Sequence, residues 1–209
     1  MKASERASTR RAPKQQRSRQ TVEAVLEGVQ RVLRRQGAEA ITTNRVAEAA
    51  GVSIGSLYQY FPDKQAIFTA LHDRHVDGVR LVIERTMSDC TVASLAELTR
   101  ELVERLADVH AEEAELHELI SVAVPGSADG FKGALQATFQ QAISRTRQDR
   151  YTAEEAERML FVLPQMVEAL VHGVAHQQPP SWRARAKDEA IRTVAVYLNS
   201  YRDAHASRY

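Results

Sequence analysis

Hydroxyl-bearing and small side chains gather in the run AGVSIGSLYQYFPDK, residues 50–64 of the chain. The hydroxyl carriers are Ser53, Ser56, Tyr58 and Tyr60. Hydroxyls can bond to phosphates and base edges, a tyrosine ring can lie against a thymine methyl, and a glycine such as Gly55 lets a backbone approach closely. The alternative is that the tyrosines are half-buried packing residues and the serines only cap a helix. The residue types favour insertion into a nucleic-acid groove.

Two short helices joined by a tight turn are expected to position these side chains. Thr42 or Thr43 can cap the first helix, which Gly51 ends because glycine adopts a positive φ easily. Ser53 can cap a second helix that runs through Tyr60, after which Pro62 ends it. The spacing predicts a helix-turn-helix over about residues 43–61, with Ser53, Gly55, Ser56, Tyr58, Gln59 and Tyr60 on its open face.

The charge of the chain is divided unevenly. Residues 1–64 hold 12 Lys and Arg against 6 Asp and Glu, whereas the remainder holds 16 against 21. Residues 1–16 carry almost no large apolar side chain, and we expect them to form a disordered basic arm. A first helix is predicted from Arg17 by apolar residues at helical spacing: Val22, Val25, Leu26, Val29, Val32 and Leu33. A basic first third of this kind favours a nucleic-acid partner.

Beyond residue 64 the apolar spacing is helical throughout. Amphipathic segments recur to the C-terminus, and TAEE at residues 152–155 is a capping box that opens a long helix. No alternating strand pattern occurs. The fold class is therefore all-α, with a basic arm at 1–16, a DNA-binding helix-turn-helix domain at 17–64 and a helical bundle at 65–209.

The segment ITTNRVAEAAGVSIGSLYQYFPDKQAIF resembles the N-terminal domain of the TetR/AcrR family of bacterial transcriptional regulators. The similarity covers about residues 17–70. It implies a homodimer with a three-helix DNA-binding head and a C-terminal domain that binds a small effector. The residues that match the family's DNA-contacting positions are Thr43, Ser53, Gly55, Ser56, Tyr58, Tyr60 and Lys64. Ile54 departs from the resemblance, because many relatives carry a polar residue there.

The C-terminal part offers candidates for an effector pocket and for a dimer interface. A pocket needs apolar walls with a few polar groups, and its candidates are His110, Phe131, Phe139, Phe161, Met166 and His172; each is also suited to the core. The helices over about 153–177 and 182–204 have broad apolar faces, which suggests a four-helix dimer interface. Its expected residues are Leu163, Val167, Leu170, Val174, Ile191, Val194, Leu198 and Tyr201.

Other chemistries have little support in the sequence. The pairs His72 and His75, and His172 and His176, have a spacing that metal ligands can use, but no cysteine or clustered carboxylate accompanies them, so we expect no metal. No phosphate loop, nucleophile elbow or zinc-protease motif occurs, so we expect no enzyme, catalytic residue or cofactor. The single Cys90 and the lack of a run of about 18 apolar residues favour a cytoplasmic protein that meets no membrane.

These observations predict a dimeric regulator that binds an inverted-repeat operator in double-stranded DNA and is released by a small-molecule effector. Repression is the favoured mode. The alternatives are an activator and an architectural DNA-binding protein without an effector. About 140 residues of apolar-faced helix follow the head, which favours effector control. The sequence does not identify the effector, the operator or the target genes.

Overall fold

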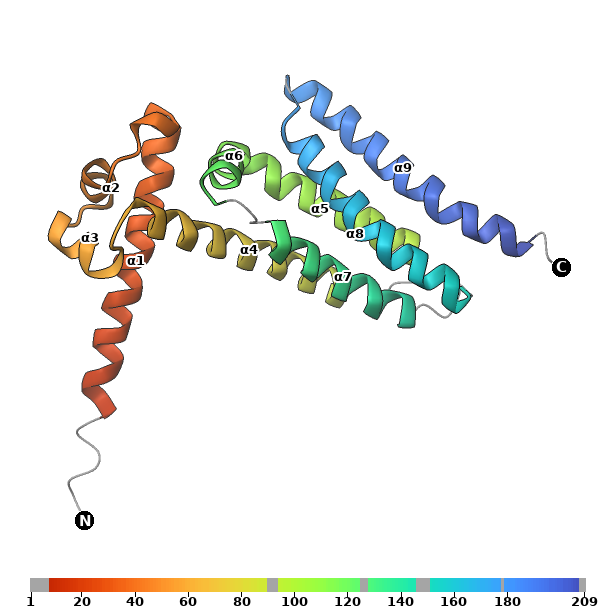
Figure 1. The fold of residues 1–209 in the computed structure, drawn as a ribbon, viewed down its shortest axis with the longest axis horizontal. Coiled ribbons are helices and arrows are strands. Elements are labelled where there is room, and N and C mark those ends of the chain that lie inside the picture. The colour runs from red at the N-terminus through yellow and green to blue at the C-terminus, as the bar shows by residue number, and fades with distance from the viewer. Residues whose placement is uncertain (1–7, 90–93, 125–127, 146–150, 178, 207–209) are drawn as a thin grey trace, which may run out of the picture. The chain divides into compact units, whose positions relative to one another are not determined.

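The computed structural model describes residues 8–89, 94–124, 128–145, 151–177 and 179–206. In these ranges the chain forms nine α-helices and one short 3-10 helix, with no strand (Figure 1). The expected all-α fold class is confirmed. Cys90 lies outside the described residues. The helices divide into two compact units, one of Met1–Asp73 with Glu118–Pro125 and the other of Arg74–His117 with Gly126–Tyr209.

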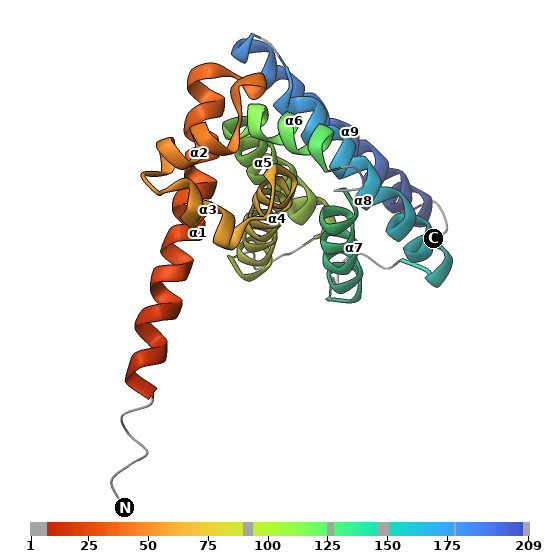
Figure 2. The ribbon, with the colours of Figure 1, turned by 60° about the vertical axis from the view of Figure 1, so that its left-hand side comes forward.

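The first unit contains α1 (Ser8–Gln36), a 3-10 helix (Ala38–Ala40), α2 (Thr43–Ala50), α3 (Ile54–Tyr60) and the start of α4 (Lys64–Asp89). α1 packs chiefly against α2, as Figure 2 shows. The apolar stripe of α1 is buried as its spacing predicts, with Val25 and Val29 fully enclosed. Gly28 lies on the same stripe, and a Cβ there would come 2.9 Å from the carbonyl oxygen of Val46. The two helix backbones therefore meet at a point where only glycine fits.

Two boundaries differ from those expected. α1 begins at Ser8 and not at Arg17, so residues 8–16, expected to be disordered, continue the helix. Arg, Lys and Gln are good helix formers, and α1 contains Pro13 near its start, where the missing N–H costs less than it would deeper in the helix. The first unit ends at Asp73 and not at residue 64, because α4 is one helix that begins in one unit and continues into the other.

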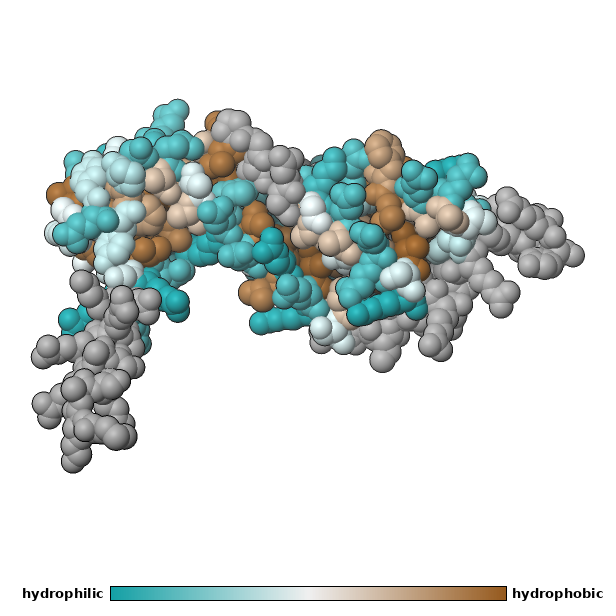
Figure 3. All heavy atoms as spheres, turned by 60° about the horizontal axis from the view of Figure 1, so that its bottom comes forward, coloured by the Kyte–Doolittle hydropathy of each residue, from teal (hydrophilic) through white to brown (hydrophobic). Residues whose placement is uncertain are grey.

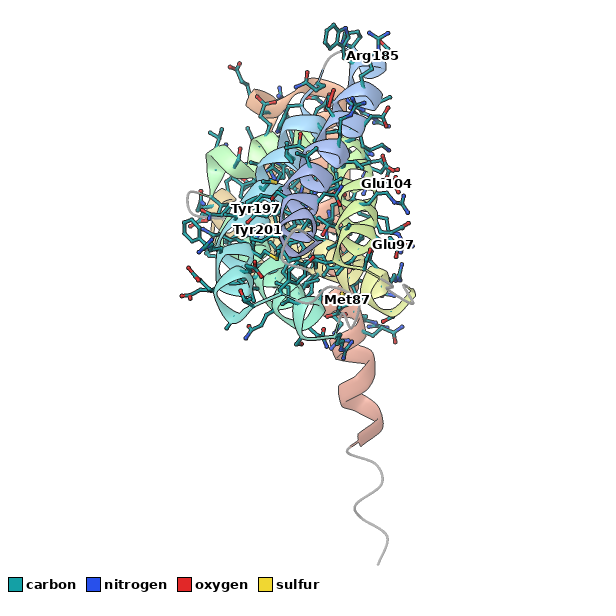
Figure 4. All side chains as sticks on the ribbon, turned by 90° about the vertical axis from the view of Figure 1, so that its right-hand side faces the viewer. Met87, Glu97, Glu104, Arg185, Tyr197 and Tyr201 are labelled. Carbon is teal, nitrogen blue, oxygen red and sulfur yellow. The ribbon has the colours of Figure 1, made fainter. Side chains whose placement is uncertain are left out.

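The second unit contains most of α4, α5 (Leu95–Glu112), the start of α6 (Ala114–Ala123), α7 (Ala128–Arg145), α8 (Ala153–Ala175) and α9 (Pro180–Ala206). α5, α8 and α9 pack against one another, and α7 packs against α8, as Figure 1 shows. The capping box expected at TAEE is present, with Thr152 and Glu155 bonded reciprocally. Figure 4 shows Glu97 and Glu104 on the outer side of α5.

α8 is an unusually apolar helix. Among the described residues it is the one helix long and apolar enough to cross a membrane, judged by length and composition alone. Met159, Leu163, Val167 and Val171 on this helix are completely buried in the core of the second unit. Packing within the chain therefore accounts for its apolar composition.

Candidate DNA-binding surface and histidine cluster

The turn between α2 and α3 is built by two residues at its ends. Gly51 closes α2 in the left-handed conformation with φ 70°, as the sequence predicts. Ser53 then caps α3, because its Oγ accepts a hydrogen bond from the backbone N–H of Ser56 at 3.1 Å. The side-chain hydroxyls of these two serines also lie 2.8 Å apart.

α3 presents its polar face to solvent. Leu57 is its one buried residue, whereas Tyr58 is 50% exposed and Tyr60 is 36% exposed. Ser53 and Gly55 are exposed as well, and Ser56 is half-buried. These are the orientations that the helix-turn-helix interpretation requires. The exposure of Tyr58 and Tyr60 opposes the alternative in which both are packing residues.

Hydrogen bonds join the expected DNA-contacting residues to other helices of the first unit. The Tyr58 hydroxyl lies 3.2 Å from Oγ1 of Thr43 at the start of α2. The Tyr60 hydroxyl donates to Oγ of Ser18 on α1 at 3.3 Å. Ser18 was not among the residues singled out in the sequence, and a pairing across 42 positions has no local signal. The structure thus brings Thr43 and Tyr58 together and adds α1 to the same surface.

Lys64 lies at the N-terminus of α4. Its side chain is exposed, with Nζ 3.4 Å from the carbonyl oxygen of Ile41 and 5.3 Å from the ring centre of Phe68. Ile41 precedes α2 by two residues, so the ammonium group lies near the start of the helix that carries Thr43. A cation in this position suits a phosphate contact.

The second unit holds a cluster of five histidines, His75 on α4, His110 on α5, His117 on α6, and His172 and His176 on α8. The ring centroids of His117 and His172 are 4.4 Å apart, and those of His75 and His110 are 5.2 Å apart. We call this set the histidine cluster. Glu113 accompanies it, because its Oε2 accepts a hydrogen bond from Nδ1 of His75 at 2.9 Å.

Burial keeps much of this cluster neutral. Desolvation, with a smaller contribution from neighbouring histidines, lowers the pKa of His110, of His117 and of His172 to about 4 each. The pKa of Glu113 is lowered mainly by the hydrogen bond from His75, so Glu113 is a carboxylate. At neutral pH these three histidines are therefore uncharged imidazoles, and the Glu113 carboxylate near them is an anion.

The structure separates the six candidates for an effector pocket. His110, Phe131 and His172 come together, with ring centroids 5.0–5.6 Å apart. Phe139 is completely buried in the core, and Met166 packs partly buried against that core. Phe161 is 72% exposed, so its expected place in a pocket is wrong: this position of α8 faces outward. Sequence reasoning missed His117 and Glu113, which have no local motif.

The residues expected at a dimer interface need a correction too. Five of the eight are 3% exposed or less, because α5 and α7 cover the faces that looked too broad for one core: Leu163, Val167, Val174, Val194 and Leu198. Leu170, Ile191 and Tyr201 are partly buried against the same core. Figure 4 shows Tyr201 beside Tyr197, and their hydroxyls are 3.3 Å apart. The five enclosed side chains have no surface left for a partner.

Outward-facing apolar residues do occur on the same two helices. Phe161 on α8 and Val196 on α9 are 72% and 64% exposed. Ala169 and Gly173 on α8 are also exposed, and a Cβ at Gly173 would meet nothing within 4 Å. On the face drawn in Figure 3, brown hydrophobic areas interrupt the teal hydrophilic surface.

A helix-turn-helix with an outward recognition helix, in an all-α chain with a second helical unit, is the architecture of a DNA-binding regulator. Residues 25–71 match the family described as bacterial regulatory proteins, tetR family. Residues 94–198 match the tetracyclin repressor-like, C-terminal domain. The chain belongs to the TetR family of bacterial regulators.

Curated relatives match the DNA-binding part. Nucleoid occlusion factor SlmA of Haemophilus ducreyi is 44% identical over 59 residues, which are 28% of this chain and 25% of that protein. The SlmA of Glaesserella parasuis is 39% identical over 67 residues, 32% of this chain and 29% of that protein. The chain thus spans between a quarter and a third of these relatives' length.

Solved structures match over most of the chain. A TetR family regulator from Marinobacter aquaeolei is 23% identical, with a TM-score of 0.54, and the match covers 85% of this chain and 97% of that one. A TetR-family regulator from Streptomyces coelicolor is 19% identical, with a TM-score of 0.60 and coverage of 87% and 96%. Thermus thermophilus FadR, solved with lauroyl-CoA, is 20% identical, with a TM-score of 0.55 and coverage of 82% and 91%. At these identities the likeness establishes the fold.

Proposed function

We propose that this chain is a homodimeric, effector-responsive transcriptional repressor that binds an inverted-repeat operator and is not an enzyme. The observation that carries the proposal is the exposed face of α3, held by Leu57 beneath it and joined to α2 through the Thr43–Tyr58 hydrogen bond. This geometry fits a major groove, with hydroxyls for phosphates and base edges. A DNA-binding protein of this kind acts in the cytoplasm.

Dimerisation follows from the size of the recognition helix. α3 has seven residues, which read too few base pairs to select one site in a genome, so two copies reading half-sites about 34 Å apart are required. We place the contact on the outward face of α8, at Phe161, Ala169 and Gly173. Their spacing in multiples of four residues forms one ridge, and the small residues allow a second helix to approach closely.

Effector control is supported by the second unit and by structural relatives. The Thermus thermophilus FadR structure contains lauroyl-CoA, and a further solved structure of similar fold, that of RolR, contains resorcinol. In this chain the polar and aromatic side chains that could receive a small molecule are His110, Phe131 and His172. Release by an effector requires that the effector prefers one conformation of the dimer over another.

Selection of DNA ligands in vitro with the purified chain tests the proposal. We expect enrichment of an inverted repeat whose half-sites are separated by one helical turn, and binding of one dimer per site in sedimentation. Enrichment of single, unpaired half-sites would exclude the dimeric mode of reading. A transcription assay on the selected site then distinguishes repression from activation.

A second candidate is an architectural DNA-binding protein without an effector. The observation that favours it is the match of the head to proteins named nucleoid occlusion factors. This function predicts DNA binding that no small molecule changes. Screening metabolites for release of the selected DNA separates the two functions, because only the regulator loses its operator on ligand addition.

A further inference from the structure

The histidine cluster has the composition and geometry of a metal site. Within the described part of the chain, His75, His110 and His117 each place one ligand nitrogen within 4.8 Å of the other two. His110 is 1% exposed, and the side chain of His75 is 7% exposed. The three come from different helices, so the site exists only in the folded second unit.

We propose that His75, His110 and His117 bind a divalent transition-metal ion of the zinc class through their Nε2 atoms. Zinc–nitrogen bonds of 2.0–2.1 Å in a tetrahedral site place ligand nitrogens about 3.3 Å apart. Small side-chain rotations would shorten the distances between the ligand nitrogens from at most 4.8 Å to this value. Imidazole ligands suit zinc, copper, iron or nickel, whereas the hard cations Mg²⁺ and Ca²⁺ prefer oxygen.

Hydrogen bonds already orient two of the three ligands. Nδ1 of His110 donates to the carbonyl oxygen of Leu106 at 2.8 Å, and Nδ1 of His75 donates to the Glu113 carboxylate at 2.9 Å. A neutral imidazole whose Nδ1 carries the proton has its lone pair on Nε2. Metal-binding histidines commonly have such a carbonyl or carboxylate partner, which fixes the ring and raises its basicity.

His172 and Phe131 pack beside the proposed ligands. His172 packs 4.4 Å from His117 and 5.0 Å from His110, centroid to centroid, and Phe131 lies 5.4 Å from His110. Three protein ligands leave the fourth position of a tetrahedral zinc ion for water or another exchangeable ligand. The contrasting interpretation, in which the histidines only pack against one another and line a pocket, predicts no metal binding.

Metal binding would also restrict the movement of α4 and α6, two helices that each have residues in the first unit. His75 lies on α4, which begins at Lys64, and His117 lies on α6, which ends at Ala123. Within the first unit, Nε2 of Gln65 on α4 donates to the carbonyl oxygen of Ala123 at 2.7 Å. An ion that fixes α4, α5 and α6 to one another therefore constrains two chain connections to the head. This regulatory consequence rests on the proposed function, whereas metal binding itself does not.

The test uses the full chain without an affinity tag, freed of metal by a chelator. We expect one Zn²⁺ per chain in a competition titration against a chromophoric chelator, and intense visible absorption from Co²⁺ in a tetrahedral site. His75→Gln and His117→Gln should each weaken zinc binding more than about 100-fold, and Glu113→Gln about 10–100-fold. His72→Gln, three positions before His75 on α4, is the matched control and should bind as the wild type does.

Circular dichroism and thermal unfolding of each apo variant establish that it is folded. Absence of zinc binding by the wild type, or wild-type affinity in the folded double variant His75→Gln/His117→Gln, overturns the metal site. Operator titrations with and without Zn²⁺ test the regulatory step. An affinity that changes in the wild type and not in His117→Gln supports it, and an unchanged affinity rejects it while the site stands. Failure to bind selected DNA under either condition rejects the proposed function instead.

Discussion

The hydroxyl of Tyr58 on α3 lies 3.2 Å from the side-chain hydroxyl of Thr43 on α2. The bond joins the two helices of the helix-turn-helix on their exposed side, opposite the contact that Leu57 makes inside. We expect both residues to contact DNA, so the bond would fix these two proposed contacts relative to each other before DNA binds.

Two substitutions of Tyr58 distinguish the contribution of its ring to DNA binding from that of its hydroxyl. Tyr58→Ala should cost roughly 1–3 kcal/mol in binding the cognate site and relax its sequence preference. Tyr58→Phe keeps the ring and loses only the hydroxyl, so it should lose less. Because Tyr58 is half exposed, the free energy of unfolding should change little. Operator titrations on matched and mismatched sites measure both effects, and wild-type discrimination by Tyr58→Ala would contradict the assignment.

Removal of the Lys64 charge tests a contact that carries no sequence information. Lys64→Ala should weaken binding to every DNA sequence and lower the slope of log affinity against log salt by about 1. Lys132→Ala is the control, since Lys132 is an exposed lysine on α7 of the other unit. Equal salt slopes for the two variants would exclude a phosphate contact at Lys64.

We expect the N-terminal segment to make a second, nonspecific contribution to DNA affinity. Residues 1–20 hold seven Lys and Arg and one acidic residue. Deleting residues 1–14 should reduce DNA affinity mainly at low salt and leave sequence preference intact, because backbone phosphates attract these charges. Ser18 and its bond to Tyr60 stay in place. A truncated chain that loses specificity while keeping its nonspecific affinity would argue against this role.

The crossing of α1 and α2 can be tested with a pair of glycine substitutions. Gly28→Ala should destabilise the first unit, because the new Cβ would lie 2.9 Å from a backbone oxygen that cannot move aside. Gly133→Ala on α7 meets nothing within 4 Å and should stabilise the chain by about 0.5–1 kcal/mol through helix propensity. Chemical denaturation of the two variants should give shifts of opposite sign.

Two substitutions on α8 test the proposed dimer face. Phe161→Glu places a charge on an outward position and should yield folded monomers with little operator affinity. Val174→Glu, at a position 3% exposed inside the core, should unfold the second unit, because it buries an unpaired charge. Sedimentation and circular dichroism separate the two results. A Phe161→Glu protein that remains dimeric would move the interface to another face.

The sequence predicted the parts of this molecule that local rules determine. The turn at Gly51, the cap at Ser53 and the capping box at Thr152 each depend on residues within four positions of one another, and all three are present. Apolar spacing correctly located the helices of the second unit. It could not tell which neighbour covers each helix, and so Val174 and Leu198 were assigned to a partner although their own chain buries them.

The histidine cluster shows the same limit more sharply. His75, His110 and His117 lie on three helices with no shared motif, and the carboxylate that accompanies them is 38 positions from His75. Spacing along one helix pairs His72 with His75, and the fold leaves His72 outside the group of three. Only the packing of α4, α5, α6 and α8 determines which imidazoles meet.

Because α3 has a single buried residue, its DNA specificity should be easy to change, both in evolution and by mutagenesis. Of the seven residues from Ile54 to Tyr60, only Leu57 is buried in the core; among the other six, Tyr58 and Tyr60 also bond through their hydroxyls to α2 and α1. Exchanging those six residues for those of another regulator should therefore redirect the protein to a new DNA sequence at little cost in folding, so long as Leu57 and the two helices behind it are kept. The exposed face of α3 can therefore be exchanged without changing the rest of the fold.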